Sequence, residues 1–102
     1  MAEHDNAVWL HAEHRVTLVE LAECSGIAEG VLRELVEYGA LSPMDPVALD
    51  FNARCVASVR AAARLTRDLE LDTAALALVL SFLERIEALQ GRVRELDAKL
   101  PR

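Results

Sequence analysis

Residues 17–39, TLVELAECSGIAEGVLRELVEYG, decide the fold of this chain because they hold the start and stop signals of two short helices. Thr17 and Glu20 have the spacing of a capping box, in which the Thr hydroxyl and the Glu carboxylate each accept a hydrogen bond from the other residue's amide. Gly26 tolerates the left-handed conformation that closes a helix. We therefore predict a first helix that starts at Thr17 and ends at Ser25-Gly26. Its buried face is expected to hold Leu18, Leu21 and Ala22.

A second helix is predicted from Glu29 to Tyr38, and Gly39 followed by Pro43 marks its end. Apolar residues recur on one of its faces: Val31, Leu32, Leu35 and Val36. Two short helices joined by a tight Gly turn are the signature of a helix-turn-helix.

Short extended segments flank this pair. Loose alternation over residues 7–14, with Val8, Leu10 and Ala12 on one side, predicts a strand before it. Two prolines in residues 42–50 exclude a helix there, and alternation at Val47, Leu49 and Phe51 suits a small wing strand.

A third helix is predicted to follow a cap at Asp50 or Asn52 and to run to about Leu69. The residues expected on its buried face are Phe51, Cys55, Val59, Ala62, Leu65 and Leu69. Another face carries Arg60, Arg64 and Arg67. Leu71-Asp72-Thr73 then supplies a break and a cap for a last helix. We therefore divide the chain into a head, residues 1–72, and a C-terminal helix, residues 73–102, within one compact domain.

The last helix carries the most regular apolar spacing in the chain. Steps of three and four residues, typical of heptad a and d positions, join Val79, Phe82, Ile86, Leu89, Val93, Leu96 and Leu100. This stripe extends beyond what the head can cover, and a second copy of the chain is the simplest source of matching apolar surface. We therefore expect a coiled-coil homodimer through these residues.

Two alternatives to this homodimer stay open: the helix folds back on its own head, or Gly91 weakens it so that it dimerises only at high concentration. The charges favour a parallel dimer, because Arg92 and Asp97 would pair in it, whereas an antiparallel one brings Arg85 near Lys99.

Charge is divided unevenly along the sequence. Residues 1–50 carry ten acidic side chains and two basic ones, whereas the second half carries seven acidic and nine basic. Proteins that bind a nucleic-acid duplex neutralise its phosphates with Lys and Arg, so a half-chain near −8 is expected to be repelled. The helix-turn-helix is therefore predicted to bind something basic, and another protein is the simplest candidate.

The order of capped helix, Gly turn, helix, Gly39-Ala-Leu-Ser-Pro43, wing, helix and terminal coiled coil resembles the MerR superfamily. Within it, Arg60-Ala-Ala-Ala-Arg-Leu-Thr-Arg-Asp-Leu-Glu-Leu-Asp72 is similar to the chaperone-modulator (CbpM) family, as are Asp50-Phe51 and residues 76–89. The similarity covers roughly residues 8–100. It implies a mainly α fold: a MerR-like winged helix-turn-helix head with a third helix, a C-terminal coiled-coil dimerisation helix and a small two-stranded β element.

The same resemblance implies a function. Members of the family are not enzymes; they bind the J-domain of the DnaJ-like co-chaperone CbpA and restrain its activity. DNA-binding MerR proteins place Arg and Tyr early in the second helix and an Arg-Tyr pair after the wing. Here the helix offers Val31, Leu32 and a single Arg33, and the wing exit is Asp50-Phe51, so base readout and phosphate clamping lose their donors.

A J-domain, as the family implies, presents a basic helix to Hsp70, and an acidic surface would cover that helix. We expect the partner surface on the outward face of the second helix and the adjoining wing: Glu29, Arg33, Glu34, Glu37, Asp45 and Asp50. Each carboxylate alone has the simpler interpretation of a solvated helix face. The seven acids against one base across residues 17–50 favour a shared role.

Other chemistry is not indicated. On a strand, His11 and His14 point to opposite faces, and zinc needs four ligands, so we expect no metal and no cofactor. Cys24 and Cys55 are expected to be structural thiols. The sequence shows no phosphate loop, nucleophile elbow or paired acid and base, so we expect a non-enzyme. It has no apolar stretch long enough to cross a bilayer, and we expect a cytoplasmic protein.

Two function classes stay open. The first is a chaperone modulator that masks the Hsp70-interacting surface of a J-domain, and nucleic acid is not its expected partner. The second is a MerR-like DNA-binding transcriptional regulator that would use Arg60, Arg64 and Arg67, whose simpler interpretation is a solvated face or ion pairs with the acidic head. A dimeric head with another partner is a third possibility.

Overall fold

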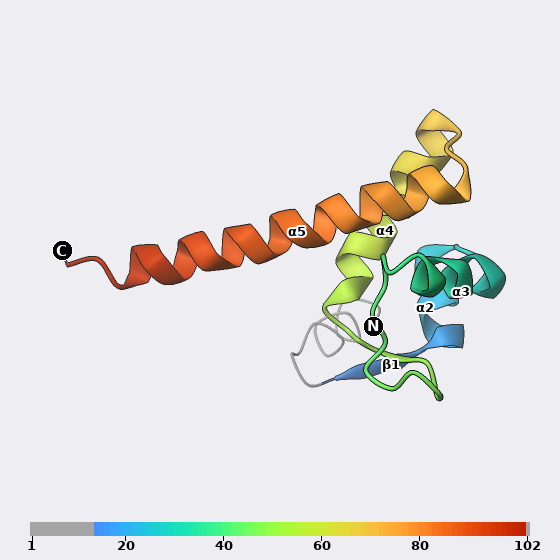
Figure 1. Ribbon diagram of the computed structural model, residues 1–102, viewed down its shortest axis with the longest axis horizontal. Helices are drawn as coiled ribbons and strands as arrows, with labels where there is room; N and C mark the ends of the chain where they lie inside the picture. The colour runs from blue at the N-terminus through green and yellow to red at the C-terminus, as the bar shows by residue number, and fades with distance from the viewer. Residues whose placement is uncertain (1–13, 102) are drawn as a thin grey trace, which may run out of the picture.

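A computed structural model describes residues 14–101 of the chain (Figure 1). The elements in order are strand β1 (Arg15–Thr17), helices α2 (Leu18–Ser25) and α3 (Glu29–Glu37), strand β2 (Asp50–Asn52), and helices α4 (Cys55–Leu69) and α5 (Thr73–Ala98). The predicted mainly α fold with a small two-stranded β element is confirmed. The strand predicted over residues 7–14 lies outside the described residues except for His14, which precedes β1.

The helix-turn-helix forms through the predicted local signals. The Thr17 amide donates to Oε1 of Glu20 at 2.8 Å, and the Glu20 amide donates to Oγ1 of Thr17 at 3.1 Å, which together make the capping box. Gly26 ends α2 at a φ of +78°, and Gly39 follows α3 at a φ of +80°. These left-handed positions need glycine, so the two helix ends are fixed by residue type.

Strands β1 and β2 pair antiparallel, with Val16 opposite Phe51, and both side chains are buried in the core. The wing strand predicted through Val47 and Leu49 is wrong in its extent. Val47 is 92% exposed in a turn, and Leu49 has a left-handed φ of +57°, which a strand does not allow. The strand is confined to Asp50–Asn52 because a tight turn occupies the preceding four residues.

The buried face of α4 is turned relative to the predicted one. Val59 and Ala62 are buried as predicted, and Phe51 is buried in β2, before the helix. The buried side chains of α4 are Val56, Val59, Ala62 and Ala63, whereas Leu65 and Leu69 are 39% and 63% exposed. Small alanines allow close approach of neighbouring helices, and α4 packs against both α2 and α5. The prediction missed Val56 and Ala63 because apolar spacing placed Leu65 and Leu69 on the buried face, whereas close helix packing selected the side with Ala63.

The cap predicted at Asp50 or Asn52 is wrong: the N-cap of α4 is Arg54, and no side chain caps this helix end. Oδ1 of Asn52 accepts from the Arg54 amide at 2.8 Å, within the turn that precedes α4.

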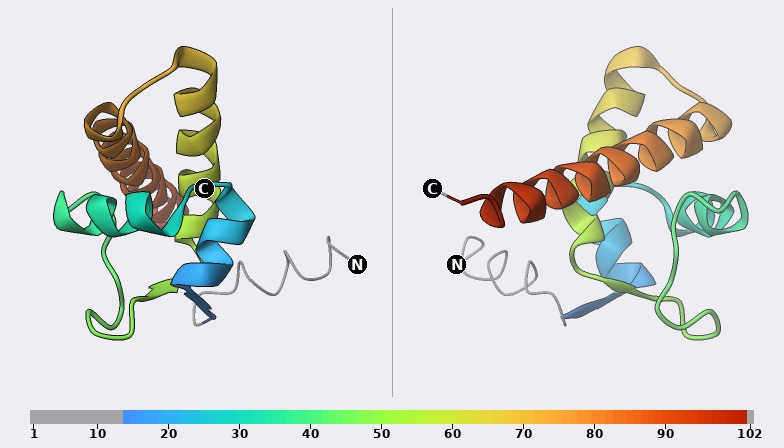
Figure 2. Two further views of the ribbon diagram at one scale, coloured as in Figure 1. Left: turned by 90° about the vertical axis from the view of Figure 1, so that its right-hand side faces the viewer. Right: turned by 60° about the vertical axis from the view of Figure 1, so that its left-hand side comes forward.

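Helix α5 begins at a cap on Asp72, whose Oδ1 accepts from the Ala75 amide at 2.9 Å, as the sequence predicted. Its first turns bury Leu76, Ala77 and Leu80 against the head. The rest projects away from the head, as Figures 1 and 2 show, and the molecule measures 49 × 29 × 28 Å. In the described chain, α5 therefore does not fold back on its own head. Among residues 14–101, no helix combines the length and the apolar composition that crossing a bilayer requires.

Candidate partner-binding surface

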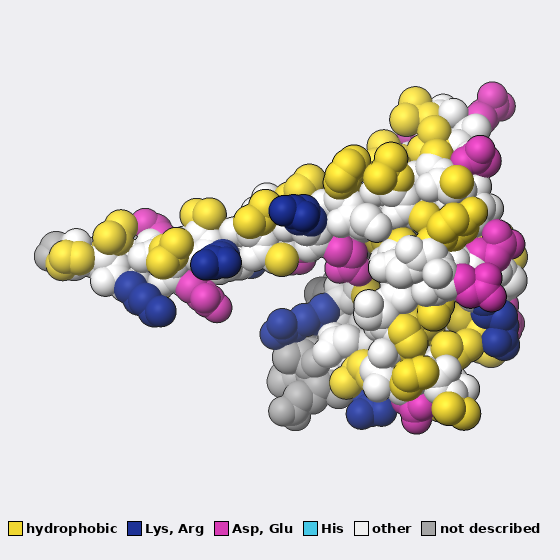
Figure 3. Space-filling model, in the orientation of Figure 1, with side chains coloured by type: hydrophobic (Ala, Val, Ile, Leu, Met, Phe, Trp, Pro, Cys, Tyr) yellow, Lys and Arg dark blue, Asp and Glu magenta, His cyan; other side chains and the backbone are white. Residues whose placement is uncertain are grey.

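Helix α3 presents one face to the core and one to solvent. Leu32 and Leu35 are fully buried, so they fix the rotation of α3 on the head. The opposite face carries four exposed side chains that the sequence predicted to form the partner surface: Glu29, Arg33, Glu34 and Glu37. Their spacing of three and four residues brings them together on the helix. Acidic side chains gather on the right-hand flank in Figure 3, where Figure 1 places α3.

The charged side chains of this face are exposed to solvent. The structure gives none of the four α3 side chains an ion-pair partner among residues 14–101. Three carboxylates and a single guanidinium therefore face solvent on two turns of helix. An exposed surface of this kind attracts cationic ligands and repels phosphates.

The two wing acids predicted for the same surface, Asp45 and Asp50, make their hydrogen bonds within the wing. The Asp45 carboxylate accepts from the amides of Val47 at 2.9 Å and Ala48 at 3.2 Å. These backbone hydrogen bonds hold the pKa of Asp45 below its ordinary value, so it is charged at neutral pH while it closes the turn. Asp50 is half-buried in β2, where its carbonyl accepts from the Met44 amide at 2.7 Å. Both acids therefore shape the wing, and the four α3 residues form the coherent part of the site.

Sequence reasoning missed the apolar part of this region. Tyr38, Met44 and Val47 are large apolar side chains left exposed at the end of α3 and on the wing. The available signal was the pair of prolines at positions 43 and 46, which favours a tight turn and so places Val47 at a loop tip instead of in a strand.

The basic residues of α4 lie beside α2. Arg60, Arg64 and Arg67 are all exposed. The Arg67 guanidinium lies 4.0 Å from the position that a Cβ on Gly26 would occupy. The positive charge of Arg60 acts on the Cys24 thiol, where it lowers the pKa against the larger effect of burial. These arginines therefore flank the helix-turn-helix on the side of α2, which itself carries Glu20 and Glu23.

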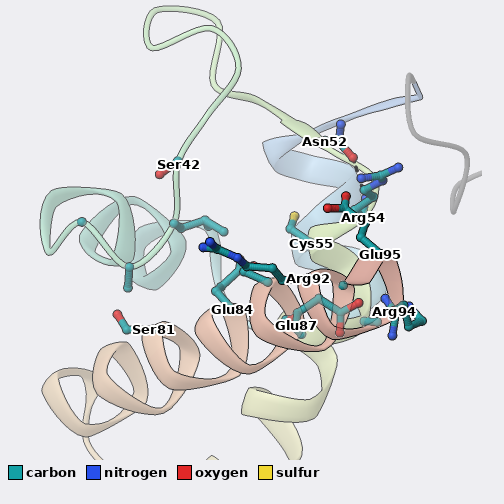
Figure 4. A pocket seen from close by; sticks show the side chains of 17 residues that line it. Ser42, Asn52, Arg54, Cys55, Ser81, Glu84, Glu87, Arg92, Arg94 and Glu95 are labelled. Carbon is teal, nitrogen blue, oxygen red and sulfur yellow. Dashed lines mark hydrogen bonds between the residues drawn. The ribbon is translucent and has the colours of Figure 1, made fainter. Parts of the chain in front are cut away.

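A cleft of about 1120 Å³ separates α5 from the start of α4 and residues 39–42 (Figure 4). Its lining includes Cys55 and Glu84. Burial raises the pKa of Glu84, with a further contribution from Glu87. Burial and the nearby Glu84 raise the pKa of the Cys55 thiol to about 12. A thiol held protonated in this way is a poor nucleophile. Burial likewise raises the pKa of Cys24.

Metal ligands do not gather in the described chain: among residues 14–101, no three His, Cys, Asp or Glu side chains are placed to hold an ion. His11, one of the histidines weighed as a ligand, lies outside those residues, as does His4.

The apolar stripe of α5 is open to solvent along the projecting part of the helix. Val79 is half-buried against the core, and the other six members are between 49% and 65% exposed: Phe82, Ile86, Leu89, Val93, Leu96 and Leu100. Figure 3 shows this stripe as a row of apolar side chains along the upper edge of the helix. The residues expected to mediate dimerisation therefore share one uncovered surface.

Comparison with known proteins identifies the family of this chain. The family described as MerR HTH family regulatory protein matches residues 16–98. Chaperone modulatory proteins CbpM from two strains of Coxiella burnetii, Dugway 5J108-111 and RSA 331 / Henzerling II, are each 30% identical over 80 residues, which is 76% of this chain and 76% of theirs. The chain belongs to the CbpM family. The CbpM resemblance found in its sequence is thereby confirmed, and its winged helix-turn-helix head is of the MerR type.

Proposed function

We propose that this CbpM-family chain is a chaperone modulator that binds the J-domain of a CbpA- or DnaJ-like co-chaperone. In this proposal it inhibits the co-chaperone by masking its Hsp70-interacting surface. The name of the relatives, chaperone modulatory protein, supports the general role. The observation that carries the proposal is the exposed face of α3, where Glu29, Glu34 and Glu37 have no ion-pair partner among the described residues.

The proposed mechanism is occupancy aided by electrostatic steering. A basic helix on the J-domain is attracted to the acidic face, which raises the association rate at low salt. Once bound, the head covers the surface that Hsp70 would use. This role requires binding alone, so we propose a non-enzyme without a cofactor that acts in the cytoplasm.

We also propose that the active form is a homodimer held by the exposed stripe of α5. Apolar residues at heptad spacing bury one another when two helices pair. A dimer would carry two heads and so two J-domain sites, and two sites increase avidity towards any partner that presents two J-domains.

The direct test measures ATP hydrolysis by Hsp70 stimulated by a purified J-domain. We expect stimulation to fall as this protein is added, while hydrolysis without the J-domain stays unchanged. Unchanged stimulation at saturating protein would remove the proposed function.

The DNA-binding alternative draws support from the exposed Arg60, Arg64 and Arg67 on α4. An electrophoretic mobility shift with random duplex DNA at low salt distinguishes the two functions. We expect no shift, because the α3 face repels phosphates. Binding that weakens steeply with added salt would favour a transcriptional regulator.

A further inference from the structure

The wing carries a short apolar tip, defined here as Met44, Pro46, Val47 and Ala48. All four residues are exposed, and Val47, at 92%, is the most exposed of the large hydrophobic residues in the described chain. A single exposed apolar side chain is ordinary on a protein surface. Four of them within five consecutive positions form a patch, and a patch that stays in water is typical of a binding surface.

The backbone holds this apolar tip in one shape. The Asp45 carboxylate accepts from the amides of Val47 and Ala48, and the Asp45 carbonyl accepts from the Leu49 amide at 2.8 Å. Leu49 adopts a left-handed φ of +57°, which is unfavourable for a leucine and persists only where the surroundings enforce it. A side chain presented by a preorganised turn loses less conformational freedom when it binds.

The apolar tip is carried by the loop that leads from α3 to β2, so the tip and the acidic face of α3 belong to the same part of the head. Figures 1 and 2 show the loop that precedes β2 below α3 in every view. Residues 17–50, which contain both, carry seven acidic side chains and one basic one. The surface therefore combines an apolar protrusion with negative charge. The complementary partner is a basic helical surface with an apolar recess between its cationic side chains.

We propose that the apolar tip is the hydrophobic anchor of the partner surface, and that Val47 enters an apolar recess on a basic helical face of the partner protein. This inference rests on the proposed function, because it concerns the same surface. The two parts of the surface act on different steps of binding. Charge on α3 sets the association rate and its dependence on salt, whereas burial of Val47 sets the dissociation rate.

The test measures association and dissociation rates of the full chain with a purified J-domain of a CbpA-like co-chaperone. Val47→Ser is expected to dissociate about tenfold faster, because burial of a valine side chain contributes a factor of that order. Its association rate and salt dependence are expected to stay unchanged. Leu69→Ser is the matched control, since Leu69 is also exposed and ends α4, on the opposite side of the head from the wing. We expect Leu69→Ser to bind as the wild type does.

A second pair of variants separates the shape of the turn from its charge. Asp45→Asn keeps the Oδ1 acceptor for the amides of Val47 and Ala48 but removes the charge. Asp45→Ala removes both. If a preorganised tip matters, Asp45→Ala dissociates severalfold faster than Asp45→Asn.

The outcomes distinguish this inference from the proposed function. If the wild type binds and charge reversal on α3 weakens binding, but Val47→Ser dissociates at the wild-type rate, the anchor is refuted and the proposed function stands. If the wild type does not bind a J-domain, both fall. If Val47→Ser instead changes binding to duplex DNA or self-association, the tip serves a nucleic acid or a second copy, and the inference is wrong.

Discussion

At the residue scale, Thr17 is the side chain on which the start of the helix-turn-helix depends. Thr17→Ala removes the hydroxyl that accepts from the Glu20 amide. We expect the free energy of unfolding to fall by about 1 kcal/mol, the usual effect of losing an N-cap. Urea denaturation measures the change. Thr17→Ser, which keeps a hydroxyl, is the control, and equal losses in the two variants would contradict the role of the cap.

Two glycines of the same motif are expected to respond in opposite directions to alanine. Gly26 has a φ of +78°, so Gly26→Ala is expected to lower the free energy of unfolding by about 1 kcal/mol or more. Gly30 lies inside α3, and no atom is within 4 Å of the position of an added Cβ. Gly30→Ala is therefore expected to raise the free energy of unfolding by about 0.5 to 1 kcal/mol. Thermal melts of the two variants would settle the signs.

Cys55 is expected to resist alkylation in the folded protein. Its pKa of about 12 leaves almost no thiolate near neutral pH, because the raised value keeps the thiol protonated up to strongly alkaline conditions. At pH 8, iodoacetamide is expected to modify Cys55 at least about tenfold more slowly in the native chain than in urea. Mass spectrometry of digested peptides follows Cys55 separately from Cys24. Equal rates in the two states would contradict the buried thiol.

Individual residues were predictable where the signal is local. Thr17 and Asp72 accept from amides three residues further along the chain. Gly26 ends α2 through its own backbone conformation. Sequence spacing and residue type alone therefore located all three. Val47 was misplaced because its environment depends on the Asp45 carboxylate and on a left-handed Leu49. Neither of these leaves a pattern in a hydropathy profile, so the turn-closing role of the Asp45 carboxylate was also missed.

At the element scale, the start and end of each helix were easier to predict than the face that it buries. The four charged residues of α3 share one exposed face, and this was predictable because the opposite face, with Leu32 and Leu35, is strongly apolar. Helix α4 has no such contrast. Alanines compete with leucines for the interior, and the choice depends on how closely α2 and α5 approach, which is a tertiary property.

Helix α5 offers a test of burial in the cleft. The pKa of Glu84 is raised in the fold, so its charged form is disfavoured, and the destabilising contribution of Glu84 is relieved as pH falls through the raised value. Glu84→Gln removes this penalty. We expect it to raise the free energy of unfolding at pH 7 by less than about 1 kcal/mol, since the side chain is partly exposed to solvent.

Urea denaturation at a series of pH values checks this expectation, and the gain of Glu84→Gln should shrink towards acidic pH. Glu95→Gln, at an exposed position of the same helix, is the control. A Glu84→Gln variant that is less stable than the wild type at pH 7 would show that the carboxylate is well solvated or paired.

At the scale of the whole molecule, the projecting α5 raises the question of what covers its apolar stripe. Leu89→Asp places a charge in the centre of the stripe, whereas Ala88→Asp places the same charge one position away, outside it. We expect sedimentation equilibrium at tens of micromolar to show a dimer for the wild type and for Ala88→Asp, and a monomer for Leu89→Asp. A wild type that stays monomeric would remove the dimer.

The central claim concerns the whole electrostatic surface: a scaffold shared with DNA-binding proteins uses an acidic α3 face to bind a basic protein. The most direct measurement is the affinity for a purified J-domain at low and high salt, for the wild type and for the double variant Glu34→Lys/Glu37→Lys. Glu95→Lys/Asp97→Lys on α5 makes the same change of charge outside α3 and the wing. We expect the α3 double variant to bind at least about tenfold more weakly at low salt and to lose most of its salt dependence, while the α5 double variant binds as the wild type does. Equal affinity of the wild type and the α3 double variant at both salt concentrations would contradict the claim.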